Sequence, residues 1–254
     1  MIIEEFCMST ENKQTRSNRN KKRGLNFRTI LGIILIIVAL GLFAMNPIKD
    51  YLIEQGAQGN AIGNLTREQI LENQNRDVTY DLDEITTIDA TTVIADGVNP
   101  DDLPVVGGLA IPELDVNLPI HLGTDNAGMY YGAGTLSPDQ RMGVSNYALA
   151  SHHSSNPELL FAPLINAEIG QTLYLTDLDK VYVYEIDVVE VVPPTAVEVL
   201  DPTDESIVTL ITCTYDLVDR VIVQGSLVET VSIDEADAEM LDAFSMQQTI
   251  VGNE

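Results

Sequence analysis

The stretch that decides the fold is Ile207-Val208-Thr209-Leu210-Ile211-Thr212-Cys213, with Thr214-Tyr215-Asp216 directly after it. Its β-branched residues predict a buried strand that ends at the cysteine. Because side chains alternate along a strand, Thr209, Ile211 and Cys213 are expected on one face. A thiol at a strand end, followed by a polar turn, stands where chemistry can occur, but a free cysteine is often an inert small hydrophobe. The strand alone leaves both interpretations open.

Short strands surround this one in the sequence from residue 105 onward. We predict strands at 105–112, 115–121, 132–136, 146–152, 171–176, 180–192, 206–213 and 220–231. Turns rich in glycine, proline and aspartate separate them, and this pattern favours an all-β sandwich or barrel. Short helical turns are expected only near 126–130 and 157–162. The loop 193–206 is too long for a hairpin turn, and long ordered loops usually bind something.

Residues 29–45 form an uncharged apolar run at the short end of what spans a bilayer. Asn46 and Pro47 are expected to end its helix. A cleaved signal peptide is the alternative, but an uncleaved anchor is favoured because the run exceeds an ordinary signal core and no small-x-small site follows closely. Basic residues cluster before the run and only Lys49 stands just after it. The positive-inside rule therefore predicts a cytoplasmic N-terminus, with everything from residue 46 outside the cell.

The charge of the outer part limits its partners. Seven of the 13 basic and three of the 39 acidic residues precede residue 29, which leaves six basic and 36 acidic residues after it. A charge of about −30 argues against nucleic acid or an anionic membrane surface as a partner. It is compatible with an amine-bearing or cationic partner, or with a surface that is acidic only for solubility.

The cysteine count predicts a free thiol. Cys7 and Cys213 lie on opposite sides of the apolar run, so no disulfide between them is expected.

The chain therefore divides into a basic cytoplasmic tail (1–28), a transmembrane anchor (29–45), a membrane-proximal linker (46–104), a β-domain (105–232) and an acidic C-terminal tail (233–254). Within the linker, Thr66 and Gln69 predict a capping box at the start of a short helix. A second short helix is expected at 90–95.

Two further residues raise the odds that Cys213 is reactive. His152 ends the predicted strand 146–152, and Arg220 opens the strand 220–231. A thiolate attacks an amide carbonyl, and a histidine can then protonate the departing amine. His152 is therefore expected to be the general acid, with its role as a base toward Cys213 left open. His153 points to the opposite side of an extended chain and is given a supporting role at most.

The remaining histidine and the arginine have less specific alternatives. His121 is expected to be structural. Arg220 is the only cation from Val181 to the end of the sequence. It is expected to hold substrate carbonyls and to stabilise an oxyanion. A surface salt bridge to Asp216 or Asp219 is the alternative.

Together these motifs resemble the class A sortases of Gram-positive bacteria, with the closest likeness to the streptococcal and lactic-type housekeeping enzymes. The resemblance rests on Thr209–Cys213, on Asn146–His152, and on Arg220 in Arg220-Val221-Ile222-Val223. It extends over nearly the whole chain, including the anchor and a short terminal helix at 237–244. It implies a closed eight-stranded β-barrel preceded by one transmembrane helix, with a few short helices.

The resemblance also implies an activity. Such enzymes cleave a Leu-Pro-X-Thr-Gly (LPXTG) sorting signal between Thr and Gly through a thioacyl enzyme. They then join the Thr carboxyl to an amine of the peptidoglycan precursor lipid II, which anchors surface proteins to the cell wall. Cys213 matches the family nucleophile, His152 the catalytic histidine and Arg220 the arginine beside the nucleophile. No cofactor is implied, and a calcium site is doubtful because the loop where some members bind calcium holds only Asp139.

The signal's Leu and Pro require an apolar groove. Matching the family pattern, we expect its walls and substrate contacts to come from Ala150, Val192, Pro194, Val197, Val199, Ile211 and Thr212. Ordinary barrel packing is the alternative for the valines, above all for Val192. Thr212 is expected to offer a hydrogen bond from its hydroxyl or its backbone.

Two other functions stay open at this point. One is a non-catalytic, membrane-tethered β-domain that binds another surface protein and carries Cys213 as a passenger. The other is a thiol hydrolase, because water can also resolve a thioacyl intermediate. A pilin-polymerising enzyme is disfavoured, since nothing after Ser232 is long and apolar enough to span a membrane.

Overall fold

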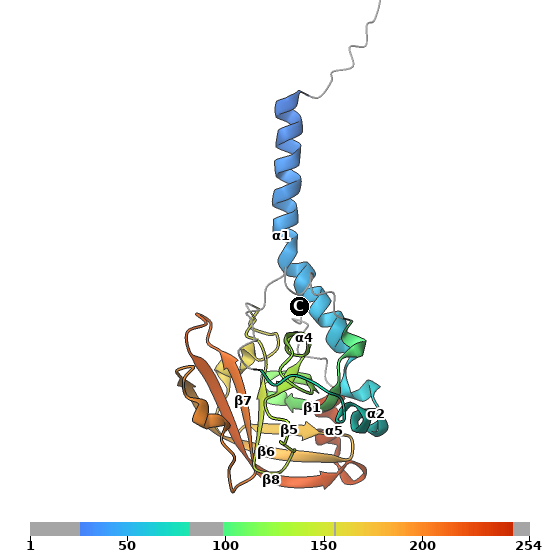
Figure 1. Cartoon of the computed structure of the whole chain (residues 1–254), viewed down its shortest axis with the longest axis vertical. Helices are drawn as coiled ribbons and strands as arrows, with labels where there is room; N and C mark the ends of the chain where they lie inside the picture. The colour runs from blue at the N-terminus through green and yellow to red at the C-terminus, as the bar shows by residue number, and fades with distance from the viewer. Residues whose placement is uncertain (1–25, 82–98, 155, 246–254) are drawn as a thin grey trace, which may run out of the picture. The chain divides into compact units, whose positions relative to one another are not determined.

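A computed structural model describes residues 26–81, 99–154 and 156–245 of the chain. Eight strands close into a barrel in the order β1-β2-β3-β4-β7-β8-β6-β5 (Figure 1). The strands are β1 Val105–Ile111, β2 Val116–His121, β3 Ala133–Thr135, β4 Asn146–Ala150, β5 Thr172–Thr176, β6 Lys180–Val192, β7 Ile207–Cys213 and β8 Arg220–Ser232. Every predicted strand is present within two residues at each end, and the predicted closed all-β barrel is confirmed.

Two of the strand pairs are parallel, β2 with β3 and β4 with β7, and the other pairs are antiparallel. The barrel interior holds one apolar cluster in which Leu149, Leu210 and Val223 are fully buried. Alternation along a strand then sends their sequence neighbours to the outer face. This fixes which side chains of β4, β7 and β8 share that outer face with Cys213.

Short helices connect or flank the strands. They are η1 Ile62–Asn64, α2 Arg67–Asn73, η3 Pro100–Asp102, η4 Pro112–Leu114, α4 Asn126–Tyr130, η5 Ala162–Asn166, η6 Val197–Leu200, η7 Ile233–Glu235 and α5 Ala238–Ser245. The predicted turn at 126–130 and the terminal helix are confirmed by α4 and α5. The helix expected at 157–162 begins only at Ala162, because Pro163 lies in its first turn, where proline is best tolerated.

The apolar run lies in α1, Phe27–Gly59. Phe27–Met45 is long and apolar enough to cross a membrane, with 19 residues and a mean hydropathy of 2.5. The prediction that Asn46 and Pro47 end the helix is wrong, because α1 continues through Pro47. Proline removes one backbone donor from a helix but has a helical φ, so it lowers stability without necessarily ending the helix.

Part of the segment expected as a linker packs on the barrel. Ile62 and Ile70 are 2% and 0% exposed and form a buried cluster with Val105 at the start of β1. Arg67 also forms an ion pair with Asp177 at 3.1 Å. The predicted capping box is confirmed, since Thr66 N–H donates to Gln69 Oε1 at 2.9 Å and Gln69 N–H donates to Thr66 Oγ1 at 3.3 Å. The helix predicted at 90–95 lies outside the described residues.

Candidate active site

Cys213 is the last residue of β7, and in the antiparallel pair with β8 it lies directly opposite Arg220, the first residue of β8. Directly opposite residues of an antiparallel pair project to the same face. The thiol is free and half-buried. The strand register therefore brings together a thiol and a guanidinium that are separated in sequence by the β7–β8 turn.

His152 reaches the same end of the sheet through β4. The parallel register ends with Ala150 beside Ile211, and Ser151 N–H donates to Ile211 O at 3.2 Å, which continues the pairing by one residue. His152 follows Ala150 by two residues, just as Cys213 follows Ile211 by two residues. Because both strands run in the same direction, their carboxyl ends meet at one edge, and His152 and Cys213 each stand two residues past the last register pair at that edge.

The imidazole of His152 is packed against an aromatic ring. Its ring centroid lies 5.0 Å from that of Tyr130 in α4, with an angle of 29° between the planes. The side chain is 7% exposed, and no hydrogen-bond partner of its buried Nε2 is found among the described residues. Burial lowers the pKa of His152 from 6.5 to about 4, because the charged ring would lose its hydration. The ring is therefore neutral at pH 7, and burial makes it a weaker base than a free imidazole.

His153 has a different environment. It is half-buried and forms a β-bridge with Leu160. Its ring meets the edge of Tyr215 at 5.8 Å and 90°, so it lies against the turn that follows Cys213. Burial lowers the pKa of His153 as well. The two histidines thus contact different elements, Tyr130 of α4 and Tyr215 of the β7–β8 turn.

Arg220 forms no ion pair with Asp216 or Asp219 in the part of the chain that the structure describes. Its Nη1 donates instead to the backbone carbonyl of Asp219 at 3.2 Å. The Asp216 carboxylate accepts from Thr214 Oγ1 at 2.7 Å and from Val218 N–H at 3.2 Å, and these bonds lower its pKa. The salt-bridge alternative for Arg220 is therefore absent, and the guanidinium is half-buried beside Cys213.

The residues expected to line the groove fall into two groups. Ala150 and Ile211 are half-buried register partners on the face of Cys213, and Val192 ends β6 opposite Arg220. The second group lies in the loop between β6 and β7. There Pro194 and Val197 are exposed and Val199 is half-buried.

Thr212 differs from the other predicted contacts. Its side chain is 3% exposed, and its hydroxyl is buried without a hydrogen-bond partner among the described residues. It alternates with Cys213 and therefore faces the barrel side of β7. A substrate hydrogen bond from this hydroxyl is not open in this arrangement, which leaves only the backbone for the predicted contact.

Two residues near the site were not identified from the sequence. Tyr130 contacts His152 from a helix more than twenty residues upstream. Asn146 lies on the outer face of β4 and donates from Nδ2 to Val199 O and Asp201 O at 2.9 and 3.1 Å. The available signal was the spacing of Asn146, Ala150 and His152, which puts a polar side chain on the reactive face of an otherwise apolar strand.

The third histidine, His121, lies away from this site. His121 ends β2 and is 1% exposed. Among the described residues, no group of three or more His, Cys, Asp or Glu side chains is arranged to hold a metal ion.

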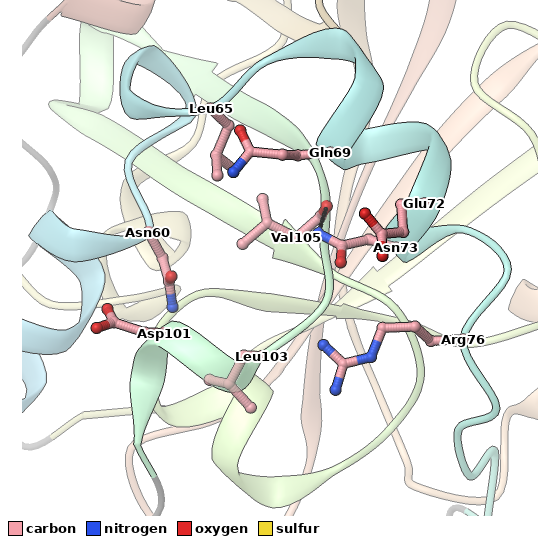
Figure 2. Close-up of a pocket in the computed structure, with 9 residues that line it drawn as sticks. All are labelled: Asn60, Leu65, Gln69, Glu72, Asn73, Arg76, Asp101, Leu103 and Val105. Carbon is pink, nitrogen blue, oxygen red and sulfur yellow. Dashed lines mark hydrogen bonds between the residues drawn. The ribbon is translucent and has the colours of Figure 1, made fainter.

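A separate pocket of ≈ 360 Å³ lies between the segment before the barrel and β1 (Figure 2). It is lined by Asn60, Leu65, Gln69, Glu72, Asn73, Arg76, Asp101, Leu103 and Val105. None of these is a predicted site residue, and the pocket is distinct from the edge that holds Cys213.

The chain is similar to known proteins over most of its length. Residues 109–228 match the family model described as the sortase domain. The chain is 38% identical over 238 residues to sortase A of Streptococcus agalactiae, covering 89% of this chain and 96% of that protein. It is 34% identical over 183 residues to sortase A of Listeria monocytogenes, covering 72% of this chain and 82% of that protein. The crystal structure of the Listeria monocytogenes sortase A superimposes with a TM-score of 0.52 and 36% identity, covering 55% of this chain and 97% of that one.

Proposed function

This chain belongs to the sortase family of cysteine transpeptidases, and we propose that it is a membrane-anchored class A enzyme. Its substrate is a surface protein with an LPXTG sorting signal, cut between Thr and Gly. The Thr carboxyl passes to an amine of lipid II. The observation that carries the proposal is the register that sets Cys213 opposite Arg220, at the edge of the sheet where β4 ends two residues before His152.

In the first half-reaction, Cys213 attacks the Thr carbonyl carbon and the carbon–nitrogen bond to Gly breaks. The thiol proton passes to His152, which is neutral at pH 7, and then to the departing Gly nitrogen. Because burial lowers the pKa of His152, the protonated ring is a strong acid toward that nitrogen. An amine cannot leave efficiently without that proton. His152 therefore acts as a base and then as the general acid, and the Thr carboxyl stays on Cys213 as a thioester.

In the second half-reaction, an amine attacks the thioester carbonyl, the carbon–sulfur bond breaks, and the amine's proton passes through His152 to the Cys213 sulfur. The product is a new amide between the signal's Thr and the acceptor. Arg220 is suited to stabilise the oxyanion in both halves, because it lies opposite Cys213 and carries a fixed fork of donors. Ala150, Ile211 and Val192 would contact the Leu and Pro of the signal from the strands, and Pro194, Val197 and Val199 from the loop.

The apolar helix fits this reaction by holding the enzyme at the membrane. Phe27–Met45 would span the bilayer with the N-terminus in the cytoplasm and the barrel outside. Both the signal-bearing protein and a lipid-linked acceptor would then meet the enzyme at one surface.

The test is to incubate the full-length protein in detergent with an LPXTG peptide, with and without triglycine as the amine, and to identify products by mass. We expect cleavage between Thr and Gly, and a Thr–triglycine product when the amine is present. Cleavage to the free Thr acid alone, even with the amine, would identify a hydrolase. No cleavage in either arm would favour a non-catalytic binding domain.

A further inference from the structure

Three polar side chains form a hydrogen-bonded row across the outer face of the barrel, one from each of three neighbouring strands. Thr209 Oγ1 in β7 donates to Asn146 Oδ1 in β4 at 2.7 Å, and Gln224 Nε2 in β8 donates to Thr209 Oγ1 at 2.9 Å. Asn146 is 8% exposed and Thr209 is fully buried. Buried polar groups are costly unless paired, so a fully paired row fixes its members in one arrangement.

The row sets the orientation of the Asn146 amide. Since the Thr209 hydroxyl accepts from Gln224, its own proton is free to go to Asn146 Oδ1. The NH₂ group of Asn146 then faces the loop between β6 and β7. There it donates to Val199 O at 2.9 Å and to Asp201 O at 3.1 Å.

These two carbonyls lie at the end of η6, Val197–Leu200. A helix end leaves its last carbonyls without partners inside the helix. The other hydrogen bonds recorded for this turn stay within the loop, such as Asp201 N–H to Glu198 O at 3.1 Å. In the described part of the chain, Asn146 is therefore the side chain that bonds the end of η6 itself, and Ser145 Oγ accepts from Thr203 N–H at 2.9 Å further along the same loop.

The row lies on the same face as the reacting groups. Asn146, Ala150 and His152 alternate along one side of β4, and Thr209 and Cys213 do so along β7. Ile222 lies opposite Ile211 and does not belong to the barrel's interior cluster. It is nevertheless only 1% exposed, so other parts of the chain shield this outer face from solvent at that position. Val197, by contrast, is 64% exposed on η6 and available to a ligand.

We propose that Asn146 is a positioning residue for the sorting signal. By holding Val199 O and Asp201 O, it keeps η6 over the strands, so that Val197 and Val199 form one wall of the groove. This inference rests on the proposed function. It assigns Asn146 to binding of the signal and not to the bond-breaking step, because the residue lies back from Cys213 along the strands.

The test uses Asn146→Asp in the full-length protein. Aspartate keeps the shape and the acceptor for Thr209, but sets an oxygen against the two carbonyls. For an LPXTG peptide we expect KM to rise by about 10- to 100-fold with kcat within about threefold of wild type. Hydrogen exchange of the backbone amides at 197–202 should quicken. Thr209→Val, which releases the amide from its partner, should change both readouts in the same direction by less.

The matched control is Asn117→Asp. Asn117 is fully buried in β2, and its Nδ2 donates to Phe244 O of α5 at 3.2 Å. This variant also replaces a buried side-chain amide donor to a backbone carbonyl, but at a different place on the barrel. It should therefore lower thermal stability and leave KM unchanged. Equal KM values for Asn146→Asp and Asn117→Asp would overturn the inference. A lower kcat with an unchanged KM in Asn146→Asp would also overturn it. If Asn146→Asp does not fold, normal KM and normal exchange in Thr209→Val would overturn it.

The two proposals fail in different ways. A wild-type protein that does not cleave the peptide contradicts the proposed function. Unchanged exchange at 197–202 in Asn146→Asp contradicts the role of Asn146 whether or not cleavage occurs.

Discussion

At the scale of single residues, position along a strand distinguishes His152 from His153. His152 follows the last register pair of β4 and β7 by two residues, as Cys213 does, whereas His153 turns toward Tyr215. Both rings lose hydration through burial, so environment alone does not distinguish a proton carrier from a packed ring. The register does, because it brings only one of them to the edge position that matches Cys213.

Replacement of each histidine tests this distinction. His152→Ala should lower the rate of acylation by at least 10²-fold to 10⁴-fold, since general acid–base catalysis contributes about that much. His153→Ala should cost clearly less, and it serves as the matched control. Single-turnover release of the Gly-containing fragment measures the step. Equal or reversed losses would mean that the wrong histidine was chosen.

Arg220 is tested by a change that keeps its charge. Lysine lacks the planar fork of five donors, so Arg220→Lys should lose most of the activity, with a loss of about 2.7–4 kcal/mol in transition-state stabilisation. The melting temperature should not change, because no carboxylate partner of Arg220 is recorded in the described residues. Near-normal kcat/KM in the lysine variant would show that charge alone suffices.

At the scale of elements, the strands and several short helices were predictable, whereas the packing of the segment before the barrel was not. The alternation in Ile207–Cys213 is local, so it predicted both the strand and the face of the thiol. Ile62 and Ile70 lie in a largely polar segment, and they are buried by contact with Val105 and with Leu65, Leu178 and Phe244, which pack against that cluster. The continuation of α1 through Pro47 is not visible in the local sequence, because proline is a strong helix breaker and the helix on both sides compensates for its missing donor.

Some residues of the site can likewise be predicted from local sequence, and others cannot. Cys213, His152 and Arg220 stand at strand ends, where local patterns indicate them. The contacts of Asn146 with η6 and of Tyr130 with His152 join segments far apart in sequence, which no local pattern reports. Thr212 was expected to offer a hydrogen bond from its hydroxyl or its backbone, and alternation with Cys213 explains why the hydroxyl is buried.

The packing of α2 on β1 gives a prediction at this scale. Ile70→Ala should destabilise the protein by about 2–5 kcal/mol, because a fully buried isoleucine leaves a cavity when truncated. Leu71→Ala is the control, since the neighbouring side chain is 45% exposed and should change stability little. Denaturant unfolding monitored by fluorescence gives both values. Similar values for the two variants would show that α2 is not held by this contact.

At the scale of the whole molecule, buried histidines predict loss of stability in acid. Burial lowers the pKa of His121 in β2 from 6.5 to about 4. Between these values the unfolded chain binds the proton more readily, so stability is complete above about pH 6.5 and falls as the pH approaches 4. Each such group lowers the free energy of unfolding by about 2 kcal/mol at pH 5 relative to pH 7. The pKa of His152 is shifted in the same direction and by the same amount.

The pH dependence can be assigned to His121 by substitution. His121→Asn removes one titrating group, so its free energy of unfolding should fall less between pH 7 and pH 5 than that of the wild type. Urea unfolding at both values measures the difference. An unchanged pH dependence in the variant would show that His121 does not carry this effect.

The central claim is that Cys213 carries the Thr carboxyl of the sorting signal as a thioester. The most direct measurement is the intact mass of the full-length protein after brief exposure to an LPXTG peptide, followed by addition of triglycine. We predict an adduct with the mass of the peptide up to Thr, located on Cys213, absent in Cys213→Ala, and released as a Thr–triglycine amide when the amine is added. Peptide cleavage that continues in Cys213→Ala, or an adduct on another residue, would contradict the account.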